Sequence, residues 1–131
     1  MLFRSLSTNQ LLERAGRLYP ASEIVSRKPD KSLLRHTFAD FHRRSRGLAQ
    51  ALRRAGLEKG DRVATLCWNH QEHVEAYFAI PGMGAVLHTL NLRLFPEQLE
   101  YIVNHAEDRV IILDASLLPR SEEHTSELQS H

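Results

Sequence analysis

The sequence predicts an α/β fold, in which a parallel sheet with flanking helices follows an antiparallel hairpin at a sheet edge. Three short apolar runs carry this prediction: residues 62–68 (RVATLCW), 85–88 (AVLH) and 109–114 (RVIILD). They alternate with two helix-like segments, and this alternation is typical of parallel strands with crossover helices. Because the first run is almost continuously apolar, we expect the sheet to be covered on both faces.

Composition bounds the function. A chain of 131 residues with 42% hydrophobic and 25% charged residues is typical of one globular domain. A formal charge of +1 gives no general reason to expect a nucleic acid or an anionic membrane as partner. Cys67 is the single cysteine, which excludes an intramolecular disulfide and is compatible with a reducing compartment, so we expect a cytoplasmic location. No apolar run approaches the roughly 18–20 residues of a transmembrane helix.

Two interpretations are open for residues 1–20. Leu11, Leu12, Ala15 and Leu18 share one face, which predicts a surface helix. Arginines without an acid before Glu13 are also found in mitochondrial presequences, although the apolar spacing favours the helix.

Residues 22–27 and 32–36 are short strand candidates separated by Pro-Asp turn chemistry, which predicts the edge hairpin. Thr37 then has the features of a helix N-cap, with Asp40 three residues later, and Gly56 is placed to end that helix. The helix has one apolar face, formed by Phe38, Phe41, Leu48, Ala49, Leu52 and Ala55.

Five arginines lie on the same predicted helix: Arg43, Arg44, Arg46, Arg53 and Arg54. They could form a phosphate-binding stripe in a nucleic-acid binder. However, Arg43 and Arg54 lie opposite the apolar face while Arg46 and Arg53 flank it, which is typical of a solvated helix. No interleaved aromatic residues or base-reading motif accompany them, so we expect no nucleic-acid partner.

In the next helix, Asn69 is the predicted N-cap with Glu72 in a capping-box position. The predicted inner stripe consists of Val74, Tyr77, Phe78 and Pro81. The third helix is predicted to begin at residues 95–97, around a proline in its first turn. Its predicted buried face consists of Leu99, Ile102, Val103 and Ala106.

Little in this stretch indicates a catalytic centre. His70 and His73 could share a helix face and hold a metal, but zinc hydrolases need i, i+4 spacing and a third ligand. We therefore expect exposed polar positions there, and we expect Cys67 to be a small buried hydrophobe rather than a catalytic thiol. Gly82 and Gly84 follow a helix and precede a strand, so they form no dinucleotide fingerprint, and the chain has no strand–glycines–helix phosphate loop.

The last twelve residues differ from the rest. Residues 120–131 read RSEEHTSELQSH, where polar and acidic residues replace the apolar periodicity. One interpretation is a solvated C-terminal tail. A sharper hypothesis is that this segment is non-native, because it is the in-frame translation of the start of a widely used sequencing-library adapter. We therefore expect a domain portion over residues 1–119 and a foreign tail over residues 120–131.

Several segments together resemble a known family. The T-F-A-D helix start (37–40), the G-D-R-V strand entry (60–63) and the H-T-L-N-L-R-L segment (88–94) occur in an order and spacing similar to those of medium- and long-chain fatty acyl-CoA synthetases. These belong to the adenylate-forming (AMP-binding) superfamily. The resemblance covers about residues 10–119. It implies a partial three-layer, flavodoxin-like sheet: the incomplete N-terminal subdomain of such an enzyme.

The resemblance implies a ligase that joins a fatty acid to coenzyme A through an acyl-adenylate, using ATP and Mg²⁺, with a possible homodimer in the parent protein. Because the family's catalytic motifs lie downstream, no catalytic, cofactor-binding or metal-ligating residue is assigned, and no cofactor is expected on this chain alone. His88 and Asn91 could approach the acyl site or a subunit contact, but structural roles are favoured. The isolated chain is predicted to be inactive and marginally stable or prone to aggregate.

An alternative stays open from the residues themselves. A stand-alone flavodoxin-like binding or regulatory module would hold its ligand at the carboxyl ends of the parallel strands. A receiver-type module would need clustered acids there, and Asp114 alone does not supply them.

Overall fold

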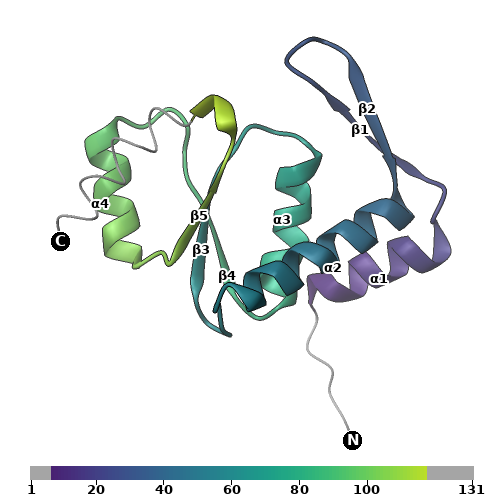
Figure 1. Cartoon of the computed structure of the whole chain (residues 1–131), viewed down its shortest axis with the longest axis horizontal. Coiled ribbons are helices and arrows are strands. Elements are labelled where there is room, and N and C mark those ends of the chain that lie inside the picture. Colours follow the sequence, from purple (N-terminus) through teal and green to yellow (C-terminus); the bar gives the residue numbers. More distant parts are fainter. Residues whose placement is uncertain (1–6, 118–131) are drawn as a thin grey trace, which may run out of the picture.

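The computed structural model describes residues 7–117 (Figure 1). The predicted tail at residues 120–131 lies outside the described residues. The elements follow in the order α1 (Thr8–Leu18), β1 (Glu23–Arg27), β2 (Leu33–Thr37), α2 (Phe38–Arg54), β3 (Arg62–Leu66), α3 (Gln71–Gly82), β4 (Val86–Thr89), α4 (Pro96–Ala106), β5 (Val110–Leu113) and the short 3₁₀ helix η1 (Ala115–Leu117). None of the described helices is long and apolar enough to cross a membrane.

The parallel sheet confirms the predicted fold class. Its strand order is β4-β3-β5, and β3 pairs in parallel with both neighbours, with Val63 opposite Leu87 on one side and Val110 on the other. The chain passes from β3 through α3 to β4, then crosses back over β3 through α4 to β5. Right-handed crossovers in opposite directions place their helices on opposite faces of the sheet, and α3 and α4 lie on opposite sides in Figure 1.

Each face of the sheet has its own apolar core. On the α2 and α3 face, the fully buried Val63 and Ile80 pack with Leu52, Leu57, Ala76, Met83 and Ala85. On the α4 face, Leu66 and Leu99 pack with Leu117 and with the half-buried Leu90, Leu92, Leu94, Ile111 and Leu113. Every residue of β5 is only half-buried, because β5 is an edge strand of the described sheet.

The prediction of a hairpin at the sheet edge is wrong in its placement. β1 and β2 do form an antiparallel pair, with Glu23 opposite Thr37, but they make a separate two-stranded sheet. Helix α2 begins directly after Thr37, so the base of the hairpin is attached to the start of α2. From there the hairpin projects away from the helices (Figure 1). The alternating half-exposed pattern of β1 suits a ribbon that packs lightly, not a strand inserted in a covered sheet.

Helix α2 begins and ends as predicted. The Thr37 hydroxyl accepts a hydrogen bond from the Asp40 amide at 3.1 Å, and Gly56 follows the helix with φ = +96°, a conformation that favours glycine. Arg43, Arg46, Arg53 and Arg54 are exposed, in agreement with a solvated face. Arg44 differs from them, because its Nε donates to both oxygens of the buried Glu75 carboxylate on α3, at 2.6 and 3.2 Å.

The predicted inner stripe of α3 is wrong. Val74, Phe78 and Pro81 are only half-buried and Tyr77 is 44% exposed. The buried positions are Gln71, His73, Glu75, Ala76, Ala79 and Ile80. The physical reason is that α3 has neighbours on more than one side: the sheet, α1, α2 and β1 all contact it. Polar residues with partners on those elements are buried together with the apolar ones.

Candidate functional site

A crevice lies at the carboxyl ends of β3 and β4. Its volume is about 620 Å³, and its walls come from the β3–α3 turn, the exposed side of α3 and the β4–α4 loop. The lining residues are Cys67, Trp68, Asn69, His73, Tyr77, Thr89, Leu90, Asn91, Leu92 and Arg93. The chain leaves β3 toward one face of the sheet and leaves β4 toward the other. Ligands of open α/β sheets bind where such connections diverge.

His73 forms the buried polar wall of this crevice. His73 is only 7% exposed. Its Nε2 lies 2.9 Å from the Thr65 hydroxyl of β3, and its ring packs against the Tyr77 ring with a centroid separation of 4.9 Å. Nδ1 is buried, and the Trp68 backbone is the polar group beside the ring. Burial lowers the pKa of His73 below its ordinary value of 6.5, since the charged ring would lose hydration there.

Asp114, just after β5, fixes the β3–α3 turn at the rim of the crevice. One carboxylate oxygen accepts the Trp68 amide at 2.7 Å, and the two oxygens lie 2.7 and 2.9 Å from His70 Nε2. The Trp68 indole also donates to the Ser116 hydroxyl at 3.1 Å. Asp114 thus has a structural role, and among residues 7–117 no acidic cluster of the receiver type surrounds it.

Two predictions about this turn are wrong. The N-cap of α3 is His70 and not Asn69, because His70 Nδ1 accepts the His73 amide at 3.2 Å while Nε2 faces Asp114. His73 is buried rather than exposed, because Thr65 supplies a partner inside the fold. Within residues 7–117, no group of three or more His, Cys, Asp and Glu side chains is arranged to hold a metal ion.

Cys67 is a small buried residue, as predicted. It is 8% exposed, and its thiol donates to the Ile112 carbonyl at 3.5 Å. Burial raises the pKa of the Cys67 thiol to about 11, and the negative charge of Asp114 adds to the rise. Because the thiolate is the nucleophile, a thiol that stays protonated at neutral pH is a poor one.

His88 and Asn91 have structural contacts. His88 Nδ1 lies 2.7 Å from the buried Asp108 carboxylate, on the α4 side of the sheet and outside the crevice lining. Burial raises the pKa of Asp108, and the contact with His88 opposes that rise. Asn91 lines the crevice, where its side-chain oxygen accepts the Arg93 amide at 2.9 Å and shapes the β4–α4 loop.

The residues that line the crevice do not fit a nucleoside triphosphate with its metal ion. Neither the turn after β3 (Cys67 to His70) nor the loop after β4 (Leu90 to Phe95) contains a glycine, so no backbone cradle for phosphates forms there. Among the described residues, no acid lines the crevice, and the carboxylate oxygens of the nearby Asp114 already contact Trp68 and His70. What the crevice offers is one imidazole, aromatic walls and the exposed Arg93.

Motif reasoning from the sequence did not find this lining. Trp68, Tyr77 and Arg93 belong to no motif, and they come together only because two connections diverge from neighbouring strands. The rule that ligands bind at the carboxyl ends of parallel strands would have indicated residues 67–69 and 89–93.

Together, the parallel sheet, its covering helices and a crevice at the strand ends define a protein of the open α/β class, in which ligands commonly bind at the strand ends. The particular family is shown by comparison, since a profile described as AMP-binding enzyme matches residues 12–131. The chain belongs to this AMP-binding enzyme family.

The relatives are CoA ligases. The chain is 48% identical over 130 residues to a long-chain-fatty-acid–CoA ligase of Thermus thermophilus, covering 99% of the chain and 24% of the ligase. It is 43% identical over 119 residues to a medium-chain-fatty-acid–CoA ligase of Ectopseudomonas oleovorans, covering 91% of the chain and 22% of that ligase. The predicted resemblance is confirmed, and the chain spans about a quarter of the length of these relatives.

Solved structures agree. An anthranilate CoA ligase, AuaEII, in complex with anthranoyl-AMP superimposes with a TM-score of 0.84 at 26% identity, over 95% of this chain and 23% of that one. A fatty acyl CoA synthetase of Mycobacterium tuberculosis gives 0.79 at 25% identity, over 88% and 23% of the two chains. The fold is that of part of an adenylate-forming enzyme.

Proposed function

We propose that residues 1–119 are the N-terminal portion of an ATP-dependent fatty acid–CoA ligase. The parent enzyme joins a fatty acid to AMP, with release of pyrophosphate, and then transfers the acyl group from AMP to the thiol of coenzyme A. The observation that carries the proposal is the 48% identity to a long-chain-fatty-acid–CoA ligase across nearly the whole chain. The strand-end crevice supports it as this portion's contribution to a binding cleft.

The chain alone is proposed to be inactive. Its crevice does not fit ATP with Mg²⁺, and its one thiol is buried with a raised pKa. ATP, Mg²⁺ and CoA therefore belong to the parent enzyme, together with the fatty acid. A cytoplasmic location and a homodimer of the parent enzyme are further proposals. The single cysteine, Cys67, is compatible with a reducing compartment.

A chimera tests the proposal. Residues 1–119 replace the matching segment of the Thermus thermophilus ligase, and pyrophosphate release is measured with ATP, fatty acid and CoA. We expect the chimera to be active and the 131-residue chain alone to be inactive. A folded but inactive chimera argues against the parent assignment. Acid-dependent pyrophosphate release by the chain alone refutes its inactivity, and saturable acyl or nucleotide binding by the chain alone favours the stand-alone module.

The division of the chain at residue 119 has a separate test. We propose that residues 120–131 are a foreign tail read from adapter sequence. The coding DNA decides this: codons that match the adapter support it, and unrelated codons refute it.

A further inference from the structure

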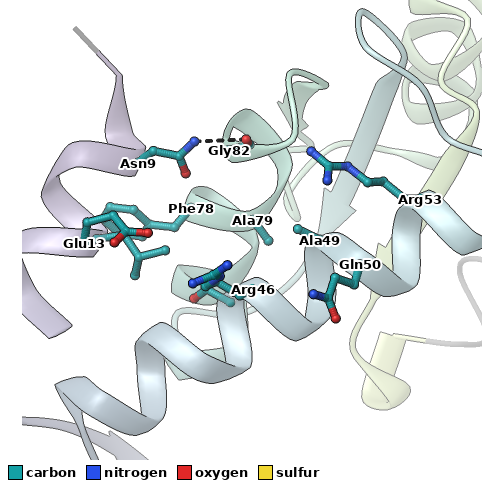
Figure 2. A pocket seen from close by; sticks show the side chains of 11 residues that line it. Asn9, Glu13, Arg46, Ala49, Gln50, Arg53, Phe78, Ala79 and Gly82 are labelled. Atoms are coloured by element: carbon teal, nitrogen blue, oxygen red, sulfur yellow. Dashed lines mark hydrogen bonds between the residues drawn. The ribbon is translucent and has the colours of Figure 1, made fainter. Parts of the chain in front are cut away.

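A second pocket lies within the helical layer, between α1, α2 and α3 (Figure 2). Its volume is about 260 Å³, just below the roughly 300–1,000 Å³ of typical ligand sites, so only a small ligand would fit. It shares no lining residue with the strand-end crevice. A ligand held here would therefore occupy a site separate from the one in the proposed function.

One end of this pocket is closed by a close contact between helices. Asn9 Nδ2 on α1 donates to the Gly82 carbonyl on α3 at 3.0 Å, as drawn in Figure 2. A Cβ on Gly82 would lie 2.5 Å from Asn9 Oδ1, so glycine permits the approach. The apolar part of the lining consists of Leu12, Ala49, Phe78 and Ala79.

Two arginines without partners border the pocket. Arg46 and Arg53 are two turns apart on α2, roughly 10 Å along the axis, so both line the same side. Neither guanidinium makes an ion pair or hydrogen bond with any residue in 7–117. Their neighbours differ, because Arg43 pairs with Asp40 and Arg44 with Glu75. Within the part of the chain that the structure describes, no direct contact neutralises these two positive charges.

Ser45 supplies an independent observation. The residue is fully buried at 0% exposure, lines the pocket beside Arg46, and its hydroxyl has no hydrogen-bond partner among the described residues. Leaving a buried hydroxyl without a hydrogen-bond partner is unfavourable, because the group has lost its hydration. An acceptor atom in the pocket would remove that cost.

The acid among the lining residues lies on the opposite wall. Glu13 belongs to α1 and lies across the pocket from Arg53 (Figure 2). Its carboxylate is 3.4 Å from His42 Nε2. The charges of the pocket are therefore separated, with Glu13 on the α1 side and the two arginines on the α2 side.

We propose that this pocket binds a small organic anion. A carboxylate or phosphate group contacts the guanidinium groups of Arg46 and Arg53 and accepts a hydrogen bond from the Ser45 hydroxyl, while an apolar body lies on Leu12 and Phe78. Arginine is suited to this role, because its planar fork matches carboxylate and phosphate geometry. The site goes beyond the proposed ligase function and does not depend on it.

The test is an amide NMR titration of the 131-residue chain with monohexyl phosphate, inorganic phosphate and hexylammonium. We expect saturable shifts along α2 with the two phosphates and none with hexylammonium. The double variant R46Q/R53Q is expected to weaken monohexyl phosphate about tenfold or more, because two charged contacts are lost. Arg54→Gln is the matched control, since Arg54 is on the same helix but outside the pocket.

Ser45→Ala separates binding from folding. Without ligand, we expect its unfolding midpoint to rise, because an unpaired buried hydroxyl is removed; with monohexyl phosphate, we expect a severalfold loss of affinity. Thermal shift at micromolar protein gives the same comparison if the chain associates at NMR concentration. The proposal is overturned if monohexyl phosphate does not saturate, if hexylammonium binds equally well, or if Arg54→Gln weakens binding as much as the double variant.

Discussion

At the scale of single residues, the buried polar side chains of α3 explain how the helix is held. The Gln71 amide group donates to Glu75 at 3.2 Å, Glu75 accepts from Arg44, and His73 contacts Thr65. Gln71, His73 and Glu75 are each nearly inaccessible to solvent. Because such groups are costly to bury without partners, their contacts select one arrangement of α2, α3 and β3.

The first prediction concerns His73 and pH. The pKa of His73 in the folded state is below 6.5. Between that pKa and pH 6.5, His73 is therefore mostly protonated in the unfolded chain and mostly neutral in the folded chain. The stability that neutral His73 contributes is present above pH 6.5 and is lost as the pH falls through the folded-state pKa. We expect the free energy of unfolding, relative to His73→Gln, to fall on acidification from pH 7 to 5 by no more than about 2 kcal/mol. Urea titrations measure it, and identical pH profiles for the two proteins would contradict it.

The second prediction compares two arginine–carboxylate pairs. Arg44→Met leaves the 4%-exposed Glu75 without its charged partner, and we expect a loss of about 2–4 kcal/mol. Arg43→Met breaks an exposed i, i+3 pair with Asp40, and we expect a much smaller loss, because both charges of that pair stay hydrated. Chemical denaturation of both variants measures the difference. Equal losses would show that burial of Glu75 is not what makes the Arg44 contact valuable.

At the scale of elements, α1 is packed closely on α2 at Gly16. A Cβ on Gly16 would lie 2.9 Å from His42 Cγ, whereas a Cβ on Gly47 would meet no atom within 4 Å. Both glycines are inside helices, where alanine has the higher helix propensity. The two positions therefore separate helix propensity from interhelical packing.

The third prediction follows from that pair. Gly47→Ala is expected to stabilise the chain by about 0.5–1 kcal/mol, because only propensity changes. Gly16→Ala is expected to destabilise it by about 1–2 kcal/mol, because the His42 ring must move and α1 must shift. Thermal unfolding gives both signs. Stabilisation by Gly16→Ala would mean that α1 is not seated on α2 as described.

Prediction from the sequence succeeded where the signal is local. Thr37, Gly56 and Pro96 start or end helices through their own chemistry, and each is placed by the structure where the sequence indicated. It failed for α3, whose buried face depends on which elements surround it. His70 was missed as a cap because its partner, Asp114, lies 44 residues away.

The same limit applies to both pockets. Cys67 was assigned correctly, because an apolar run around a thiol indicates burial. The lining of the strand-end crevice and the grouping of Ser45 with Arg46 and Arg53 depend on how helices and strands pack, which no local pattern contains. The arginines were recognised as flanking the apolar face, but their lack of partners became visible only in three dimensions.

At the scale of the whole molecule, the described sheet has two open edges. β5 (Val110–Leu113) pairs only with β3, and β4 also has a single neighbour. Unpaired apolar edge strands are templates for pairing with another chain. The half-buried side chains of β5 add apolar surface to that edge.

The fourth prediction is that the isolated 131-residue chain associates as its concentration rises. Light scattering and gel filtration between about 10 and 500 μM measure this, in the range where exposed edges cause aggregation. The chimera proposed above is the control, because there the sheet has the rest of the ligase beside it. A chain that stays monomeric and unfolds cooperatively throughout that range would contradict the prediction.

The strand order has a consequence for synthesis. Because β5 pairs on the side of β3 away from β4, β3 and β4 can pair with each other before β5 has been synthesised. Several elements that contact one another are synthesised before β5: the β1–β2 hairpin, helices α1 to α3, and strands β3 and β4. We infer that the chain can fold vectorially, with the β3–α3–β4 unit as a nascent template onto which β5 is added as translation proceeds.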